Sequence, residues 1–401
     1  MTTIIHGLPA RSSVARHWPG IIATALTATV AGMPGFTVGA LAPTIEADLH
    51  ISPNAIGLAM SIFYAATAFG SLAAKRVAAR LPVPMVLSVA ALVASAVMLT
   101  ASQVTDWGML TAILLVGGLS NALVQPVASR LIAARVPEHR RSLAAGIIGA
   151  ALGAGTLVPG LLVALVLPAY GWRTALLLAG IGALVPAALA PLARAPGRPL
   201  PTRPKAASEA GDKRRRVGRV LGLWALAAAL SAAGNNAVAT YFVELGTRSG
   251  LDTIVTGNLL SLSALFAIAV RITAGALTDR APHRNWAVIV TMMLAGGLGL
   301  ALIAIGTPTT FVLGAILAFS AGWGWTGLLL ATTLRLVPDR SEDAGHTVQI
   351  GVYAGATVAP FAFGALSSAF GFPATALLAA VAAAAAAAAM TAGALLLRRA
   401  R

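Results

Sequence analysis

Twelve long apolar stretches run through this chain of 401 residues and constrain its fold more than any other feature. Each has about the 20 residues that a helix needs to cross a bilayer, and short polar breaks separate them. Gly and Pro occur inside several stretches, as at Pro159 and Pro360, which is common in membrane helices and costly in water-exposed ones. The pattern predicts an all-α membrane protein with spans at residues 19–42, 54–74, 82–101, 108–133, 143–168, 173–193, 219–243, 254–278, 286–306, 310–333, 344–368 and 373–397.

Composition excludes most other classes of protein. Only 10% of the residues are charged, whereas a soluble protein has about 25%. The net charge of +16 would suit a nucleic-acid partner, but the cations are spread over the breaks between spans. The chain has no cysteine, and its spans contain no carboxylate dyad, metal-ligand cluster, phosphate loop or nucleophile–base pair. We therefore expect no enzymatic activity, no cofactor, no metal and no nucleic-acid partner.

The positions of the cations predict the orientation in the membrane. With both termini in the cytoplasm, the outer loops hold only Arg173 and Arg248, Arg130 and Arg271 lie inside spans, and 24 of the 28 Lys and Arg residues are cytoplasmic. The first stretch is too long for the apolar core of a signal peptide, and eleven more spans follow it. We expect a multi-pass protein of the cell (inner) membrane.

The chain divides into two similar halves. An Arg- and Pro-rich segment separates six spans from six, which predicts an N-terminal six-helix bundle at 1–193, a cytoplasmic linker at 194–218 and a C-terminal six-helix bundle at 219–401. Tyr170-Gly171-Trp172 precedes the sixth span as Phe370-Gly371-Phe372 precedes the twelfth, 200 residues later. Repeats of this kind place a substrate site between the halves, and rocking of one half against the other gives alternating access.

A short motif names the family. The eighth span ends in Gly275-Ala-Leu-Thr-Asp279-Arg280, with Arg284 four residues on, and the N-terminal half has a degraded copy with Ala74 in place of the acid. This pattern resembles the signature of the major facilitator superfamily, and the resemblance covers essentially the whole chain. It implies that Gly275, Asp279, Arg280 and Arg284 form a gating cluster at the cytoplasmic edge; the alternative is a loop anchor. Glycine permits close helix contact, and the charged groups suit helix ends.

Arg271 is the strongest candidate for a substrate contact. It lies eight residues before Asp279, about 12 Å inside the edge at 1.5 Å per residue, with no acid one turn away in its own helix. A guanidinium there is costly without a partner and suits a carboxylate. It also resembles the substrate-anion arginine of the oxalate/formate antiporter and monocarboxylate transporter branches. The alternatives are that Arg271 extends to the gating cluster or pairs with another helix.

The spans also contain uncharged polar and aromatic residues that are expensive in hydrocarbon and so are candidates for the cavity. Interhelical hydrogen bonding or packing is the alternative role for each. Adjacent amides point about 100° apart on a helix, so at most one of Asn235 and Asn236 is expected to face a cavity. The full set of predicted substrate contacts is Arg271, Asn235, Asn236, Tyr241, Asn121, Gln125, Tyr64, Trp323, Gln349 and Tyr353.

Two functions remain open within this class. The first is a secondary active transporter, a symporter or antiporter, that moves a small organic anion, a carboxylate, across the membrane. The second is a proton-coupled drug or metabolite exporter of the same superfamily, to which the two tryptophans of the tenth span are suited. A non-transporting receptor built on this fold would need an added domain or a long tail. We expect a monomer whose partners are the lipid bilayer and a small-molecule substrate, with or without a coupling proton.

Overall fold

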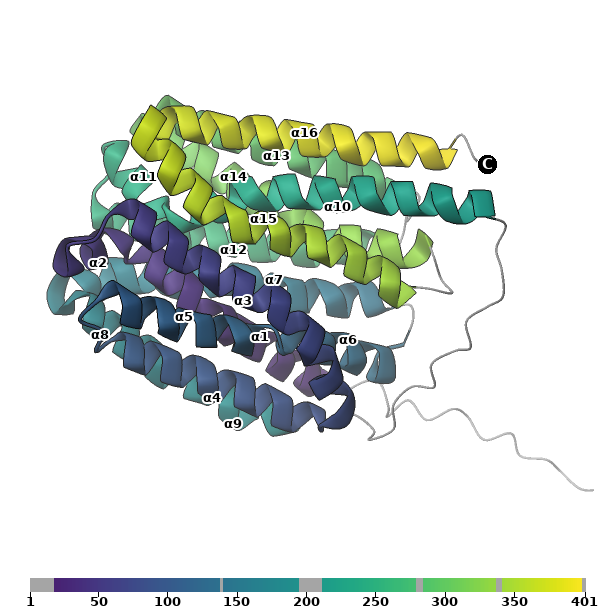
Figure 1. Cartoon of the computed structure of the whole chain (residues 1–401), viewed down its shortest axis with the longest axis horizontal. Coiled ribbons are helices and arrows are strands. Elements are labelled where there is room, and N and C mark those ends of the chain that lie inside the picture. The colour runs from purple at the N-terminus through teal and green to yellow at the C-terminus, as the bar shows by residue number, and fades with distance from the viewer. Residues whose placement is uncertain (1–17, 138–139, 195–210, 279–283, 337–340, 399–401) are drawn as a thin grey trace, which may run out of the picture.

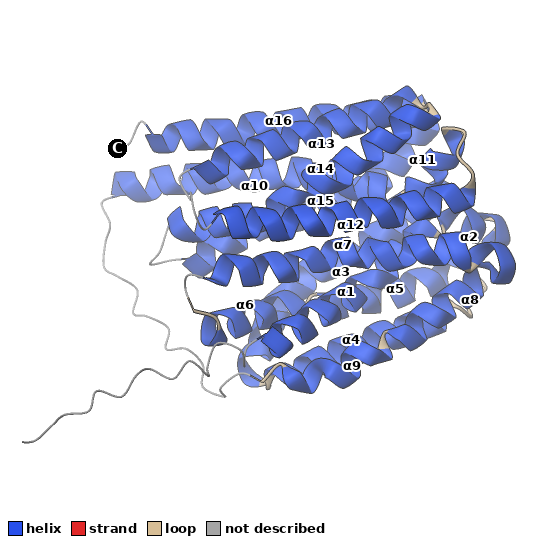
Figure 2. Cartoon of the chain, turned by 180° about the vertical axis from the view of Figure 1, so that it is seen from behind, coloured by secondary structure: helices blue, strands red, loops and turns tan. Residues whose placement is uncertain are grey.

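The computed structural model of the chain describes residues 18–137, 140–194, 211–278, 284–336 and 341–398. Within these ranges every element is a helix and none is a strand (Figure 2). The N-terminal half contains α1 (Trp18–Ala40), α2 (Ala42–Leu49), α3 (Pro53–Arg80), α4 (Val83–Ala101), α5 (Trp107–Asn121), α6 (Val124–Arg135), α7 (Arg141–Leu165), α8 (Leu167–Gly182), α9 (Leu184–Leu189) and a 3₁₀ turn at Ala190–Leu192. The C-terminal half contains α10 (Gly211–Thr240), α11 (Phe242–Arg248), α12 (Thr253–Thr278), α13 (Asn285–Ile305), α14 (Pro308–Leu336), α15 (Ser341–Phe370) and α16 (Phe372–Arg398).

Twelve helical segments in the described ranges are long and apolar enough to cross a membrane, which confirms the predicted number of spans. Their boundaries agree with the predicted ones to within about four residues, except that the second span ends at Arg80 rather than at residue 74 and the sixth begins at Leu167 rather than at residue 173. Leu167 and Pro168 open a helical turn that changes direction at Gly171, whose φ is +75°. The prediction began after this kink because the kink interrupts the apolar pattern.

The same kink recurs in the second half. Gly371 has a φ of +81° between α15 and α16, at the position that corresponds to Gly171 in the internal repeat. This left-handed backbone is strained for residues with a Cβ and easy for glycine. The two glycines thus show that the repeat extends to backbone conformation.

Local signals set the ends of the helices. The Ser52 side chain accepts a hydrogen bond from the Ala55 N–H at 3.4 Å at the start of α3, and Asp106 does the same for Met109 at 2.9 Å in α5. Gly306 ends α13 in a left-handed conformation with φ +75°. These are the caps that Ser, Asp and Gly supply to otherwise unpaired backbone groups.

The two halves meet along two helix pairs, α7 with α12 and α3 with α15, and α7 and α12 lie side by side in the middle of the molecule (Figure 1). Small residues bring the first pair close, since a Cβ on Gly257 would lie 2.8 Å from the Gly160 carbonyl oxygen. Without a hydrophobic drive inside lipid, such close backbone contact is what holds membrane helices together. Large apolar side chains such as Phe69 and Leu165 point outward, 76% and 67% exposed, as lipid-facing residues do.

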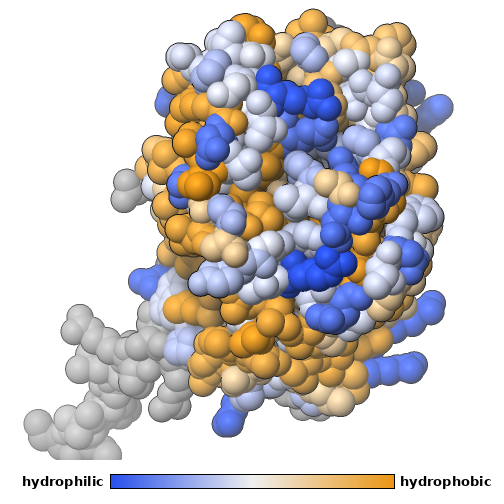
Figure 3. Space-filling view, turned by 90° about the vertical axis from the view of Figure 1, so that its left-hand side faces the viewer, coloured by the Kyte–Doolittle hydropathy of each residue, from blue (hydrophilic) through white to orange (hydrophobic). Residues whose placement is uncertain are grey.

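The two ends of the bundle differ. We call the end that carries α2 and α11 the α2/α11 end, and the opposite end, where α1 begins and α16 ends, the linker end (Figure 1). Figure 3 shows the α2/α11 end face-on, with hydrophilic side chains gathered over its middle. The domain boundaries 1–193, 194–218 and 219–401 stay a prediction.

Candidate functional site

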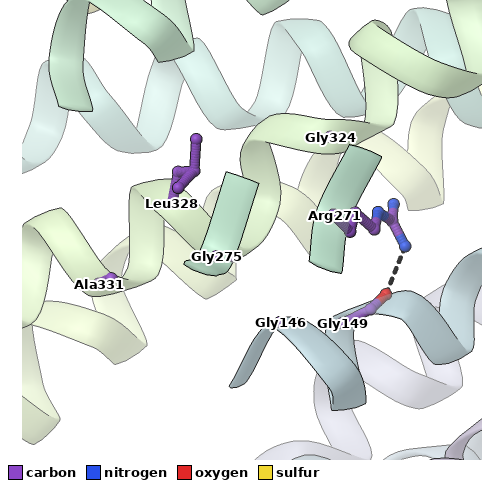
Figure 4. Close-up of a pocket in the computed structure, with 8 residues that line it drawn as sticks. Gly146, Gly149, Arg271, Gly275, Gly324, Leu328 and Ala331 are labelled. Atoms are coloured by element: carbon purple, nitrogen blue, oxygen red, sulfur yellow. Dashed lines mark hydrogen bonds between the residues drawn. The ribbon is translucent and has the colours of Figure 1, made fainter. Parts of the chain in front are cut away.

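Arg271 lies on α12 between the two halves and is only 3% exposed. Its Nε and Nη2 donate to the carbonyl oxygen of Trp323 on α14 at 3.0 and 2.8 Å. Its Nη1 donates to the carbonyl oxygen of Gly149 on α7, across the boundary between the halves (Figure 4). Within the described residues, the side chain therefore pairs with no acid and binds the main chains of two other helices.

The charge of Arg271 is not balanced by any carboxylate in the part of the chain that the structure describes. The ion pairs found among the described residues lie at the α2/α11 end, and neither includes Arg271. Carbonyl dipoles and the face of the Trp323 ring, 5.5 Å from the guanidinium carbon, offset only part of the cost of burying a cation. A guanidinium has five N–H donors, and three of them make the bonds described above. Donors remain for an anion.

A narrow cleft lies next to Arg271. A water-sized sphere can occupy about 10 Å³ of it, which is room for about one water molecule in this conformation. Its wall comes from α7 of one half and α12 and α14 of the other (Figure 4). Five glycines and three other residues line it, namely Gly146, Gly149, Gly275, Gly324, Gly327, Arg271, Leu328 and Ala331. A polar group in an apolar, inter-half cleft is the usual composition of a small-molecule site.

Aromatic rings lie beside the guanidinium. The Trp323 ring is nearly parallel to Phe319, with centroids 6.2 Å apart, and packs at a tilt on Phe36 of the other half at 5.7 Å. The indole nitrogen of Trp323 is buried and has no hydrogen-bond partner among the described residues. Trp323 is therefore close to Arg271 through both its carbonyl oxygen and its ring.

Asn235 on α10 supports the same part of α14. Its Nδ2 donates to the Gly322 carbonyl oxygen at 2.5 Å, one residue before Trp323. Asn236 donates instead to Ala232 in its own helix at 2.8 Å. Only Asn235 thus reaches a neighbouring helix, and neither amide lines the cleft.

The other predicted contacts lie apart from the cleft. Asn121 donates to Thr67 at 3.3 Å, Tyr64 packs edge-on against Phe63, and a side-chain hydrogen bond joins Gln349 to Tyr353 on α15. Gln125 is half-buried on α6. Their roles in substrate binding stay predictions.

Tyr241 lies at the α2/α11 end, where it closes a second contact between the halves. Its hydroxyl lies 2.9 Å from the Pro53 carbonyl oxygen and 3.1 Å from that of Pro360, and its ring stacks on Phe363 at 5.2 Å. Ser61 on α3 accepts from the Phe361 N–H at 3.1 Å. These neutral bonds hold α3 against α15.

The gating motif is described only in part. Gly275 is buried in the wall of the cleft, and a Cβ on Gly146 of α7 would lie 3.7 Å from its Cα, as expected for a glycine that permits close contact. Arg284 is exposed at the start of α13. Asp279 and Arg280 lie outside the described residues.

Sequence reasoning missed the partners of Arg271, because they are the main-chain oxygens of Gly149 and Trp323. Every residue has such an oxygen, so residue type does not reveal which ones bind. The available signal was the density of glycine on α7 and α14, which lets a side chain approach the backbone. It also missed a carboxyl pair at the α2/α11 end, Glu46 on α2 and Glu244 on α11, because these residues lie outside the spans.

The helices, the two repeated halves and the inter-half cleft define a membrane transporter. The model of the Major Facilitator Superfamily matches residues 24–347, and the chain belongs to this family. Its members are transporters and not enzymes. The fold agrees, because a bacterial homolog to the human lysosomal transporter Spinster, in an inward-facing and unoccupied conformation, superposes with a TM-score of 0.74 at 16% identity over 97% of this chain and 99% of that one.

Curated relatives match over part of the chain. A gallate transporter of Pseudomonas putida is 29% identical over 182 residues, which is 45% of this chain and 40% of that protein. The 4-hydroxybenzoate transporter PcaK of Pseudomonas aeruginosa is 26% identical over 169 residues, 42% of this chain and 38% of that one. The chain thus spans about two fifths of the length of the curated relatives it matches.

Proposed function

We propose that this protein is a secondary active transporter that moves a small organic carboxylate across the membrane by alternating access. One observation carries the proposal: Arg271 is buried between the two halves, on the wall of the cleft, with no carboxylate partner in the described part of the chain. A buried cation without a counter-ion attracts an anion, and a guanidinium matches the two oxygens of a carboxylate.

The contact to Gly149 links binding to movement. Arg271 belongs to the C-terminal half, and its Nη1 bonds to a carbonyl of the N-terminal half. A carboxylate that enters the cleft competes with the Gly149 carbonyl for this donor. Arg271 then faces a full negative charge in place of a carbonyl dipole. Because that exchange favours one arrangement of the halves over another, substrate binding shifts the balance between conformations.

The relatives support the same chemical class. Gallate and 4-hydroxybenzoate, which two of them are named for, are both carboxylates on an aromatic ring. In this chain Trp323, Phe319 and Phe36 lie beside the guanidinium. These rings also favour the second candidate, an exporter of drugs or metabolites, because they suit apolar compounds without charge.

A binding experiment separates the two candidates. Purified protein is titrated with 4-hydroxybenzoate and with 4-hydroxybenzamide, which has a neutral amide in place of the carboxylate, and affinity is read by calorimetry or thermal shift. We expect the carboxylate to bind and the amide not to. Arg271→Lys should weaken carboxylate binding about tenfold, since it keeps the charge and loses the fork, and Arg271→Ala at least about 100-fold.

Arg173→Lys is the matched control, because Arg173 is half-exposed and pairs with Asp48 at the α2/α11 end. It should bind like the wild type. Should Arg271→Ala fail to fold, the Lys variant still decides. Wild-type affinity for the carboxylate in folded Arg271→Lys and Arg271→Ala, or equal binding of the amide, contradicts the anion proposal and favours the exporter.

We also propose that the linker end and both termini face the cytoplasm of a cell with this protein in its inner membrane, and that the gating motif acts at that end. The distribution of cations supports this orientation. Because the chain has no cysteine, a single cysteine is a clean probe. Asp106→Cys should react with an impermeant thiol reagent from outside intact cells and Ser208→Cys should not; the reverse result contradicts the orientation.

A further inference from the structure

The carboxyl groups of Glu46 and Glu244 lie where the two halves meet at the α2/α11 end. Glu46 is on α2 of the N-terminal half, Glu244 is on α11 of the C-terminal half, and the two helices are in contact. Glu244 has a side chain only 10% exposed. Its Oε1 accepts from Arg248 Nε and Nη2 at 3.1 and 2.9 Å.

Each carboxyl group has one oxygen without a donor. Glu46 Oε1 and Glu244 Oε2 are buried and lack a hydrogen-bond partner among the described residues. A carboxylate oxygen deprived of water and of donors is costly. Binding a proton reduces this cost, because the carboxylic acid carries no charge and has an O–H donor of its own.

The charged groups around the pair leave an excess of negative charge at this end. Of the helices in contact with α2, α1 has no titratable residue and α3 has none in its first two turns. Helix α8 supplies the exposed Tyr170 and Arg173, which pairs with Asp48 at 2.6 Å, and α11 supplies Glu244 and Arg248. The other titratable groups at this end are Tyr241, His50, Asp106, whose Oδ1 accepts from the Met109 N–H, and Asp252, whose Oδ1 accepts from the Ile254 N–H. Arg248 is already committed to Glu244 and also lies over the Phe372 ring at 4.4 Å. Glu46 therefore has no cation of its own.

We propose that Glu46 binds a proton when the α2/α11 end is closed and releases it when the halves part there, so that this end is a proton-sensitive gate. Contact with α11 is the part of its surroundings that belongs to the other half, and parting the halves removes it. The inference rests on membership of the superfamily and on this contact. It does not depend on the carboxylate proposed as substrate, and either idea can fail alone.

The sign of the pH dependence follows from linkage. Burial raises the pKa of Glu46 from 4.5 to about 7 in the closed structure; the Glu244 charge adds to this, and Arg248 opposes it. Proton binding then stabilises the closed end fully below the open-state pKa of about 4.5, and this stabilisation is lost as the pH rises through about 7. For one proton, the ratio of closed to open molecules should fall about 30-fold between about pH 5.5 and about pH 8.5.

A distance measurement tests the gate. Thr105 and Ala369 are exposed residues at this end on opposite halves, and cysteines there carry spin labels in a chain that has no other cysteine. In purified protein the short, closed distance should lose population as the pH rises. In Glu46→Gln the ratio of closed to open molecules should stay constant, within about twofold, between about pH 5.5 and about pH 8.5, because the amide is a neutral mimic of the carboxylic acid. Glu244→Gln should move the midpoint to lower pH, since it removes a neighbouring charge.

Asp252→Asn is the control, because Asp252 is an exposed acid at the same end and makes no ion pair among the described residues, and it should titrate like the wild type. A pH-independent distance in the wild type, or a wild-type titration in Glu46→Gln, overturns the proposal. Should the Gln variant fail to fold, infrared spectroscopy of the wild type decides: the carbonyl stretch of a protonated carboxylic acid should disappear as the pH rises through about 7. Absence of that band at about pH 5.5 also overturns it.

Discussion

The two places where the halves touch carry opposite charge and are held by different groups. At the cleft, a buried guanidinium on α12 binds main-chain oxygens of α14 and α7. At the α2/α11 end, a tyrosine hydroxyl and stacked rings make the contact, and of two carboxyl groups only Glu244 pairs with an arginine among the described residues. The first region thus has an excess of positive charge and the second an excess of negative charge.

Under the two proposals made above, this difference separates the two tasks of a transporter: the Arg271 region selects an anionic substrate, and the Glu46 region senses protons at one end. Since both regions lie between the halves, each ion would act on the same equilibrium between conformations. The following changes test whether the two regions are as distinct as the structure indicates, beginning with the largest expected effect.

Gly57→Ala should strongly disfavour closure of the α2/α11 end. A Cβ at this position of α3 would lie 2.5 Å from the Pro360 carbonyl oxygen and would also overlap the Tyr241 hydroxyl, and overpacking of this kind costs about 1–3 kcal/mol. The closed population, read from the Thr105 and Ala369 labels, should fall at least about fivefold. Gly222→Ala, whose Cβ meets nothing within 4 Å, should behave like the wild type. An unchanged distance would place closure elsewhere.

Tyr241→Phe should weaken the same contact to a smaller degree. The ring can still stack on Phe363 at 5.2 Å, but the hydroxyl contacts with Pro53 and Pro360 are lost. A hydrogen bond of this kind contributes about 1 kcal/mol, so the closed-to-open ratio should fall about fivefold. Tyr170→Phe changes a ring that is 70% exposed and should have no effect on the label distance. If Tyr241→Phe has none either, the rings alone hold this end.

Trp323→Phe should have the smallest effect, although Trp323 is next to Arg271. Its two bonds to the guanidinium come from the main-chain oxygen, which every residue has. Only the ring contact at 5.5 Å and the unpartnered indole nitrogen change, so carboxylate affinity in calorimetry should drop less than about fivefold. A loss as large as that of Arg271→Ala would mean that the indole itself binds the substrate.

Most of the fold follows from the sequence, because the bilayer leaves few alternatives. An apolar run of about 20 residues in lipid has to satisfy its backbone internally and therefore forms a helix. The repeat at Gly171 and Gly371 was visible as a pattern and reappears as a shared positive φ. The start of the sixth span was missed because a kink at Gly171 divides a helical turn from the rest.

The site follows from the sequence less completely. Arg271 stood out because a cation in an apolar run has an energetic cost that residue type alone reveals. Its partners and the position of Tyr241 at the α2/α11 end depend on which helices are neighbours, and periodicity within one helix does not contain that information. Glu46 and Glu244 are 198 positions apart, and only the folded chain brings their helices together.

The anchoring of Arg271 by main-chain oxygens has a consequence for how this lineage diversifies. Side-chain partners change identity with a single base substitution, whereas the carbonyls of Gly149 and Trp323 persist as long as their helices keep their course. Mutations around the cleft therefore alter its shape while the cation stays where it is. If the cleft is the substrate site, as proposed, such a scaffold can change its substrate through single, tolerated substitutions, each of which keeps a positive charge at the same depth.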